Sequence, residues 1–267
     1  MTQTGPAGNN GNNGLITVQD LVIGYGETIV LDGVSFAVGR GEILIILGPS
    51  GCGKSTLLKA LAGLVQPFRG TIRIAGEDIT GADGEEALRR ARRHLGVLFQ
   101  SGALLESLTV AENVALPLQE FTDLPPELIE TVVQLKLDLV GLGRFGHLMP
   151  GELSGGMKKR VGLARTMVLD PEILLCDEPA GGLDPVTARE VDELLIELST
   201  FLGITLVVVT HQVATIENLS SRCLMLDPQT KQIIAAGTLA DLKESAIPRV
   251  RSFFQRQIHP QPGKGIG

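Results

Sequence analysis

The stretch Gly48-Pro49-Ser50-Gly51-Cys52-Gly53-Lys54-Ser55-Thr56 decides the fold of this chain. It lies between an apolar run at residues 43–47 and a helix-forming run at residues 57–64. This is the strand, glycine loop and helix pattern of a phosphate-binding P-loop. In such a loop the backbone N–H groups turn inward around phosphate oxygens, and the following helix adds the positive end of its dipole. The stretch therefore predicts a nucleotide site within an α/β fold.

Four side chains of this loop have predicted roles. Lys54 supplies a point charge to the phosphates, and Ser55 can place its hydroxyl on a Mg²⁺ ion that bridges them. Thr56 is a candidate for a second phosphate contact. Cys52 lies at a helix N-terminus beside Lys54, an electropositive setting that lowers a thiol pKa. We therefore expect Cys52 to be reactive toward alkylating reagents and to be protected by bound nucleotide.

Composition restricts the class of protein. The chain has 267 residues, 43% of them hydrophobic, which is enough for a sizeable core. Its aliphatic runs fall far short of the roughly 20 residues that span a bilayer. The three cysteines have no metal-ligand or disulfide spacing, and the net charge of −7 argues against a nucleic-acid partner. The arginine cluster at residues 89–93 fits the C-terminal end of a helix that opens with acidic residues.

The remaining pattern outlines the domain organisation. Residues 1–14 are rich in glycine and asparagine and predict a disordered lead-in without a secretory signal. Residues 15–36 predict a small antiparallel β layer ahead of the P-loop strand. Between residues 101 and 161 two helical segments, 110–118 and 127–139, predict a helical subdomain inserted into the α/β core. The main domain then extends to residue 246, and residues 247–267 form an amphipathic tail.

Two carboxylates mark a second predicted part of the site. Residues 173–178 form an apolar strand that ends in Asp177 and Glu178, at the sheet edge where ligands bind in α/β proteins. Asp177 can hold Mg²⁺ through water or Ser55, and Glu178 can polarise an attacking water. His211 follows another buried strand, residues 205–210, and thereby reaches the same edge. An ordinary structural histidine remains an alternative there.

Three further features are ambiguous when taken alone. Gln100 ends a short strand and is a candidate contact to Mg²⁺ or water. Ser154 can cap a helix, and Gly155 and Gly156 make its N-terminus a second anion site. Tyr25 lies in a polar turn, where its ring could stack on a base or simply decorate the surface.

Together these residues resemble the ATP-binding cassette family over roughly residues 15–245. Tyr25 matches the aromatic that stacks on the base, residues 48–56 the Walker A motif, and Gln100 the Q-loop. The signature motif corresponds to residues 153–157, Walker B to residues 173–177, and the catalytic carboxylate to Glu178. Leu183-Asp184 matches the D-loop and His211 the switch histidine. The resemblance implies a RecA-like P-loop NTPase core, ATP and Mg²⁺ as ligands, and Glu178, His211 and Lys54 as the residues of hydrolysis.

The family also implies an assembly. It implies a head-to-tail dimer in which Ser154, Gly155 and Gly156 of one subunit close on the γ-phosphate held by the P-loop of a second copy. Because the chain carries one cassette and no apparent membrane span, we expect it to dock on a separate permease at the cytoplasmic face of the inner membrane. Residues 103–108, after Gln100, are a candidate for that contact, and plain subdomain core is the alternative.

The chain departs from the common family pattern at a few positions. The signature ends in Met157, Gln212 follows His211, and Ser221 stands where an aspartate is usual. Met157, with the tail at residues 247–254, resembles the ATPases of Mce-type bacterial phospholipid transporters. That resemblance implies an Mce-type substrate-binding protein and a small accessory protein as further partners. Other transport cassettes, such as amino-acid importers and lipoprotein exporters, and soluble non-transport cassettes are the alternatives.

The tail holds two of the phenylalanines, Phe253 and Phe254. We expect this pair to pack against the same dimer or against an associated small protein rather than against a membrane.

Overall fold

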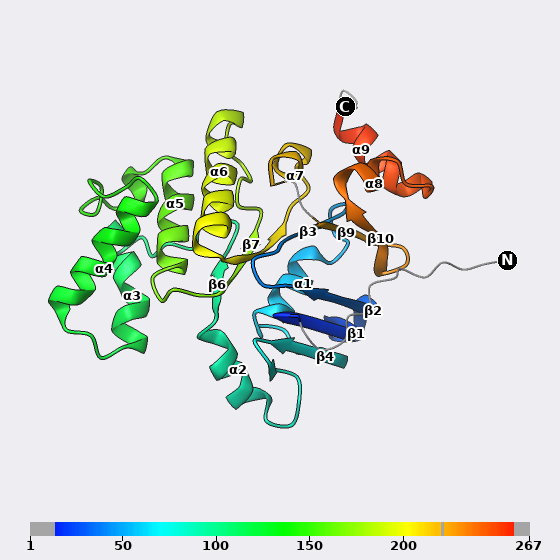
Figure 1. The fold of residues 1–267 in the computed structure, drawn as a ribbon, viewed down its shortest axis with the longest axis horizontal. Helices are drawn as coiled ribbons and strands as arrows, with labels where there is room; N and C mark the ends of the chain where they lie inside the picture. The colour runs from blue at the N-terminus through cyan, green and yellow to red at the C-terminus, as the bar shows by residue number, and fades with distance from the viewer. Residues whose placement is uncertain (1–13, 220–221, 259–267) are drawn as a thin grey trace.

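The computed structural model describes residues 14–219 and 222–258. The predicted lead-in at residues 1–14 thus lies almost entirely outside the described residues, as does the end of the predicted tail. The described chain forms two sheets and a group of helices beside them (Figure 1).

The larger sheet has six strands in the order β10-β9-β3-β8-β7-β6. The strands are β3 (Ile43–Leu47), β6 (Leu95–Leu98), β7 (Ile173–Asp177), β8 (Thr205–Val209), β9 (Arg222–Asp227) and β10 (Gln232–Thr238). All neighbouring pairs are parallel except β9 and β10. The carboxyl ends of the five parallel strands therefore meet along one edge of the sheet.

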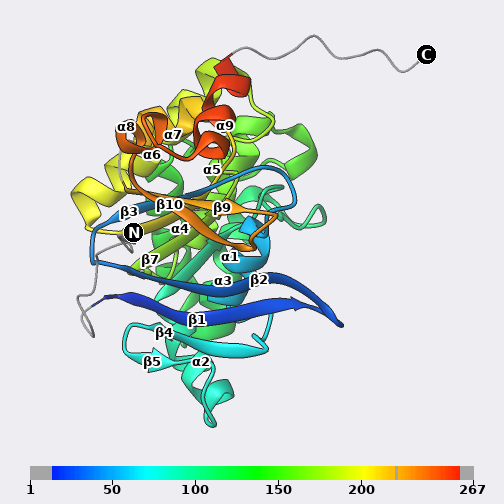
Figure 2. The ribbon, with the colours of Figure 1, turned by 90° about the vertical axis from the view of Figure 1, so that its right-hand side faces the viewer.

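The smaller sheet is antiparallel and has the order β2-β1-β4-β5. It contains β1 (Ile16–Tyr25), β2 (Thr28–Val38), β4 (Arg69–Ile74) and the short β5 (Glu77–Asp78). Figure 2 shows this sheet as a separate layer below the larger one. Its strands β1 and β2 form the antiparallel layer that the sequence pattern of residues 15–36 predicts, and β4 and β5 extend the sheet beyond that stretch.

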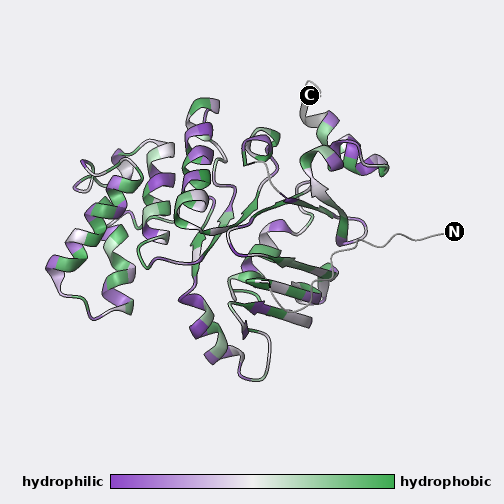
Figure 3. Ribbon diagram, viewed as in Figure 1, coloured by the Kyte–Doolittle hydropathy of each residue, from purple (hydrophilic) through white to green (hydrophobic). Residues whose placement is uncertain are grey.

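The buried side chains of the central strands alternate between two hydrophobic cores. Ile45 and Leu47 of β3 join one cluster of buried side chains, while Leu44 and Ile46 join another. Successive residues of a strand point to opposite faces, so the two clusters occupy the two faces of the larger sheet. One cluster packs against the helices α3 to α6, and the other against α1 and the antiparallel layer. Strands that are apolar on both faces are typical of covered parallel sheets, as the hydropathy colouring of Figure 3 illustrates.

Helix α1 (Lys54–Leu61) begins inside the P-loop stretch, earlier than the predicted 57–64. Gly53, with φ of 100°, ends the loop in a left-handed conformation, and Gly63, with φ of 67°, turns the chain just beyond the helix. Two glycines thus set both ends of the helix.

The helices beside the sheet are α3 (Val110–Phe121), α4 (Pro126–Leu139), the 3₁₀ turn Pro150–Glu152 and α5 (Gly155–Thr166). Thr109 and Glu112 form a reciprocal capping box at the start of α3. Pro117 lies within α3, which continues past the predicted end at residue 118. Helix α5 runs past residue 161, the predicted boundary of the helical subdomain, and its Leu163 and Ala164 belong to the core cluster shared with the sheet.

The remaining helices are α2 (Gly84–Arg92), α6 (Pro185–Leu202), α7 (Val213–Leu219), α8 (Leu239–Lys243) and α9 (Pro248–Ile258). Arg90 of α2 forms ion pairs with Glu77 and Glu86, so part of the arginine cluster is neutralised locally. Helix α9 packs on its own chain, where Val250, Phe253 and Phe254 are buried. This agrees with the expectation that the phenylalanine pair is not left in water.

Candidate active site

The P-loop connects β3 to α1 and adopts a conformation that requires glycine. Gly48, Gly51 and Gly53 have φ angles of 150°, 77° and 100°. A Cβ atom at Gly48 would lie 2.6 Å from the carbonyl oxygen of Leu226, and one at Gly53 would lie 2.9 Å from the Leu31 side chain. No L-residue with a side chain fits these positions without strain.

Lys54 lies at the centre of this loop. Its ammonium donates hydrogen bonds to the carbonyl oxygens of Gly48 (2.8 Å) and Pro49 (3.0 Å), and the residue is only 8% exposed. The loop therefore wraps around a buried positive charge.

Ser55 and Asp177 bring the P-loop and the end of β7 together. The Ser55 hydroxyl donates to the Asp177 carboxylate over 3.1 Å. Burial raises the pKa of Asp177, the hydrogen bond from Ser55 lowers it, and the nearby charge of Glu178 raises it further. A cation bound beside this carboxylate would counter the cost of its burial.

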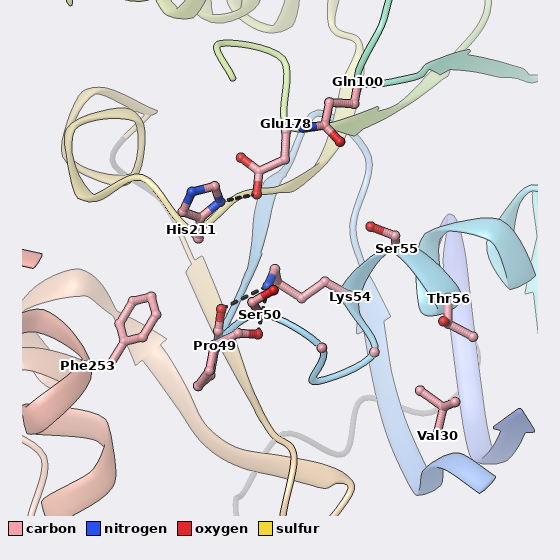
Figure 4. Close-up of a pocket in the computed structure, with 13 residues that line it drawn as sticks. Val30, Pro49, Ser50, Lys54, Ser55, Thr56, Gln100, Glu178, His211 and Phe253 are labelled. Atoms are coloured by element: carbon pink, nitrogen blue, oxygen red, sulfur yellow. Dashed lines mark hydrogen bonds and ion pairs between the residues drawn. The ribbon is translucent and has the colours of Figure 1, made fainter. Parts of the chain in front are cut away.

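Glu178 follows β7 with a left-handed backbone, φ 48°, which is uncommon outside glycine. Its carboxylate is 3.0 Å from the Thr210 hydroxyl, which donates to it, and 2.5 Å from Nδ1 of His211. Glu178 is 7% exposed, whereas the His211 side chain is about half exposed. The two residues that follow β8 thus orient the carboxylate that follows β7, and Figure 4 marks the contact between His211 and Glu178 with a dashed line.

Lys54, Ser55, Glu178 and His211 line one pocket of about 640 Å³. Its other walls come from the P-loop, from Gln100 after β6, and from two residues that the sequence reasoning missed, Val30 of β2 and Phe253 of α9 (Figure 4). The lining comprises Val30, Gly48, Pro49, Ser50, Gly51, Gly53, Lys54, Ser55, Thr56, Gln100, Glu178, His211 and Phe253.

Cys52 does not have the setting that the sequence suggested. Its side chain is 1% exposed, and burial raises the pKa of the thiol more than the neighbouring Lys54 lowers it. The expectation of a reactive, low-pKa thiol is therefore wrong. Proximity to the positive charge was visible in the sequence, but the inward rotation of the side chain was not.

The other predicted site residues lie outside this pocket. Tyr25 is 51% exposed at the end of β1, and Asp177 lies beneath Ser55. Ser154 caps α5 through a hydrogen bond from the Met157 N–H, and Asp184 caps α6 through bonds from the N–H groups of Val186 and Thr187. Gly156 packs against Thr187, so the start of α5, which carries the signature motif, lies beside the start of α6.

The fold and this pocket define a P-loop nucleoside triphosphatase, and the comparisons with known proteins make the class more specific. The chain belongs to the ABC transporter family, which matches residues 31–181. ATP is therefore its nucleotide, and hydrolysis of ATP is the activity of its class.

Several known proteins are similar to almost the whole chain. It is 41% identical to the intermembrane phospholipid transport system ATP-binding protein MlaF of Escherichia coli K12, over 90% of this chain and 88% of that protein. It is 42% identical to the probable ribonucleotide transport ATP-binding protein mkl of Mycobacterium leprae, over 92% of this chain and 70% of that protein.

Among solved structures, the dimeric ATP-binding cassette MJ0796 bound to ADP and Pi matches with a TM-score of 0.75 and 31% identity. The match covers 84% of this chain and 98% of MJ0796. These similarities confirm the predicted fold class and the prediction of an ABC ATPase. Within residues 14–219 and 222–258, no helix combines the length and apolar character needed to cross a membrane.

Proposed function

We propose that this chain is the ATP-hydrolysing subunit of a transporter that moves phospholipid across the bacterial envelope. It would act at the cytoplasmic face of the inner membrane, bound to a permease. The catalytic part of the proposal rests on one observation. A buried carboxylate, Glu178, is held by Thr210 and His211 on the wall of a pocket that also contains the P-loop lysine.

The P-loop would bind the phosphates of ATP through the backbone N–H groups of Gly48 and of residues 50–56, Cys52 included; Pro49 has no N–H and only shapes the loop. The ammonium of Lys54, now bonded to loop carbonyls, would turn to the β- and γ-phosphate oxygens, and Thr56 would contact the phosphates as well. Tyr25 would stack on the base. These contacts position the nucleotide with its γ-phosphate toward Glu178.

Ser55, Asp177 and Gln100 would hold Mg²⁺. Ser55 and Gln100 line the pocket, and the Ser55 hydroxyl is hydrogen bonded to the Asp177 carboxylate behind it. Hydroxyl, carboxylate and amide oxygens are the donors that this ion prefers. When bound, Mg²⁺ neutralises charge on the β- and γ-phosphates.

Glu178 would accept a proton from a water molecule as the water oxygen attacks the γ-phosphorus. The bond between the γ-phosphorus and the bridging oxygen breaks, and ADP leaves with that electron pair. His211 and Thr210 would hold the carboxylate in the orientation that the attack requires. Both bonds are already formed in the structure.

The position of the signature residues supports assembly of two copies. Ser154, Gly155, Gly156 and Asp184 do not line the pocket of their own chain among the described residues. They are instead available to close the pocket of a second copy, and the similar cassette MJ0796 forms a dimer. The start of α5 would then present its N–H groups to the γ-phosphate across the dimer interface.

Two variants test the catalytic assignment. Glu178→Gln keeps the size of the side chain and should bind ATP with nearly unchanged affinity while hydrolysing it far more slowly. Lys54→Ala should lose ATP binding itself. Fluorescent nucleotide titration and phosphate release measure the two effects separately, and an equal loss of ATP affinity in both variants would refute the assignment.

The phospholipid assignment is supported by the similarity to MlaF along 90% of the chain. The same resemblance favours an Mce-type binding protein and a small accessory protein as partners of the permease complex. The nearly equal identity to mkl makes ribonucleotide transport the second candidate.

Reconstitution of the purified transporter would distinguish the two candidate substrates. ATP-dependent transfer of labelled phospholipid between vesicles and binding protein is expected, without uptake of labelled ribonucleotide. The opposite result would assign the chain to the second function.

A further inference from the structure

A buried lysine on α5 joins the two strand ends that carry Gln100 and Glu178. The Lys159 ammonium donates to the main-chain carbonyl of Glu178 at 3.0 Å and also to the carbonyl of Gln100. Lys159 is only 6% exposed. Burial lowers its pKa, and the charges of Glu178 and Asp177 oppose that change. A charge buried in this way is normally retained only where it is paired and hydrogen bonded.

The strand register explains why one side chain reaches both carbonyls. Strands β6 and β7 are parallel neighbours, and Leu98 pairs with Cys176. Gln100 and Glu178 each follow two residues after this pair, so the chain leaves the sheet at the same level in both strands. Lys159 binds the main chain where the ladder between these strands has ended.

Close packing brings α5 against the loop after β6. A Cβ atom at Gly162 would lie 3.2 Å from the Cα of Gly102, which is tighter than ordinary contact. Arg165, further along the same helix, donates to the carbonyls of Gly102 and Ala103, both at 2.9 Å. Two cations of one helix therefore hold the main chain of the loop that begins at Gln100.

The backbone of Glu178 depends on such support. Its left-handed φ of 48° is unfavourable for a residue with a side chain. The peptide groups on both sides are held, since the Glu178 N–H donates to Val209 (2.9 Å) and its carbonyl also accepts from Gly181 (2.9 Å). Lys159 is the one contact of this set that comes from the helical subdomain.

We propose that Lys159 is a positioning residue for hydrolysis. From helix α5 it fixes the main chain of Glu178 and the main chain of Gln100 relative to each other. The inference rests on the role proposed for Glu178 in attack on the γ-phosphate. Ser154 caps helix α5, which begins with Gly155 and Gly156, and these three residues would contact the nucleotide of a second copy. Lys159 therefore connects contact with the partner's nucleotide to the orientation of the carboxylate in its own pocket.

The test compares Lys159→Met with Lys158→Met in the full chain. Lys158 is the neighbouring lysine on α5, more exposed and 3.7 Å from Glu106, so its variant is a matched loss of charge. Lys159→Met should bind ATP within about twofold of the parent while kcat falls by about ten- to a hundredfold, the scale of a misplaced catalytic group. Lys158→Met should keep the parent kcat. An unchanged kcat in folded Lys159→Met, or a fall in ATP affinity equal to the fall in kcat, overturns the proposal.

A second comparison separates positioning of Glu178 from an independent effect. In the Glu178→Gln background, adding Lys159→Met should lower the residual single-turnover rate no further, because residues that act through one group are not additive. Independent, multiplied losses overturn the proposal. If Lys159→Met does not fold, Lys159→Gln, which is too short to reach both carbonyls, replaces it with the same expectations.

The single variant Glu178→Gln distinguishes a failure of the role proposed for Glu178 from a failure of the role proposed for Lys159. Parent-like hydrolysis by that variant refutes the role of Glu178 itself, whatever the result at Lys159.

Discussion

Substitution of Phe254 by alanine should release helix α9 while leaving the rest of the domain folded. Phe254 is 3% exposed and packs edge-to-face on Phe253, with ring centroids 5.2 Å apart. Removing a buried phenylalanine side chain costs about 3–5 kcal/mol, including its aromatic pairing. Helix α9 is terminal in the described chain and shares only one side with the core, so a loss of this size should exceed what holds it in place.

Hydrogen exchange measured by mass spectrometry gives the magnitude. A loss of about 3 kcal/mol corresponds to exchange at least about a hundredfold faster in residues 248–258. Exchange in β3 and β8 should stay within a few-fold of the parent, and the melting temperature of the domain should change little. Phe201→Ala is the matched control, because that ring lies 80% exposed on α6 and its removal should leave exchange unchanged.

Two results would refute this reasoning. Unchanged exchange in residues 248–258 would show that the Phe254 ring does not hold the helix. An equal acceleration in β3 and β8 would show that α9 unfolds only together with the whole domain. Because Phe253 lines the nucleotide pocket, the released variant should also bind ATP with altered affinity.

Three further predictions concern separate positions. Cys52 should react with iodoacetamide much more slowly at pH 7 than a free thiol does, because burial raises its pKa; mass spectrometry measures the rate, and parity with a free thiol would contradict the structure. Asp192 is 1% exposed, one of its carboxylate oxygens has no partner among the described residues, and burial raises its pKa. The Asp192 carboxyl binds its proton more tightly in the folded state, so the parent loses stability as pH rises. Asn at this position does not titrate, so in urea unfolding at pH 8 the free energy of unfolding of Asp192→Asn should match that of the parent or exceed it by up to about 1–2 kcal/mol. The advantage should be smaller at pH 5, and a larger advantage at pH 5 would contradict the expected sign. Leu105 is 45% exposed, so Leu105→Glu should retain fold and ATP binding but co-purify less permease, and full co-purification would remove residues 103–108 from the interface.

Local sequence pattern was sufficient for the elements that carry the site. Residues that are adjacent in the chain are enough to predict three of these elements: the P-loop, the apolar strand before Glu178 and the strand before His211. The parallel arrangement then brings their carboxyl ends to one edge, as the general rule for α/β sheets predicts.

Contacts between distant segments were not visible in the sequence. Phe253 reaches the P-loop pocket across most of the chain length, and no pattern near it indicates a partner. The inward rotation of Cys52 depends on Gly48, whose missing side chain leaves room for the thiol. The hydrogen bonds from Lys159 to the carbonyls of Gln100 and Glu178 depend on the register of β6 against β7. That register cannot be predicted from a lysine in the middle of a helix.

The place of β3 in the larger sheet has a consequence for how the protein is made. Its two neighbours, β8 and β9, come from residues 205–227, long after the P-loop strand has left the ribosome. Non-local pairing of this kind forms late and slowly. A nascent chain that ends at residue 181 already contains the P-loop, Gln100, the signature residues and Glu178, yet it lacks both strands that flank β3. A nucleotide pocket that can bind ATP therefore forms only after the final third of the chain has left the ribosome. Until then the apolar β3 lacks its neighbouring strands and needs protection from aggregation.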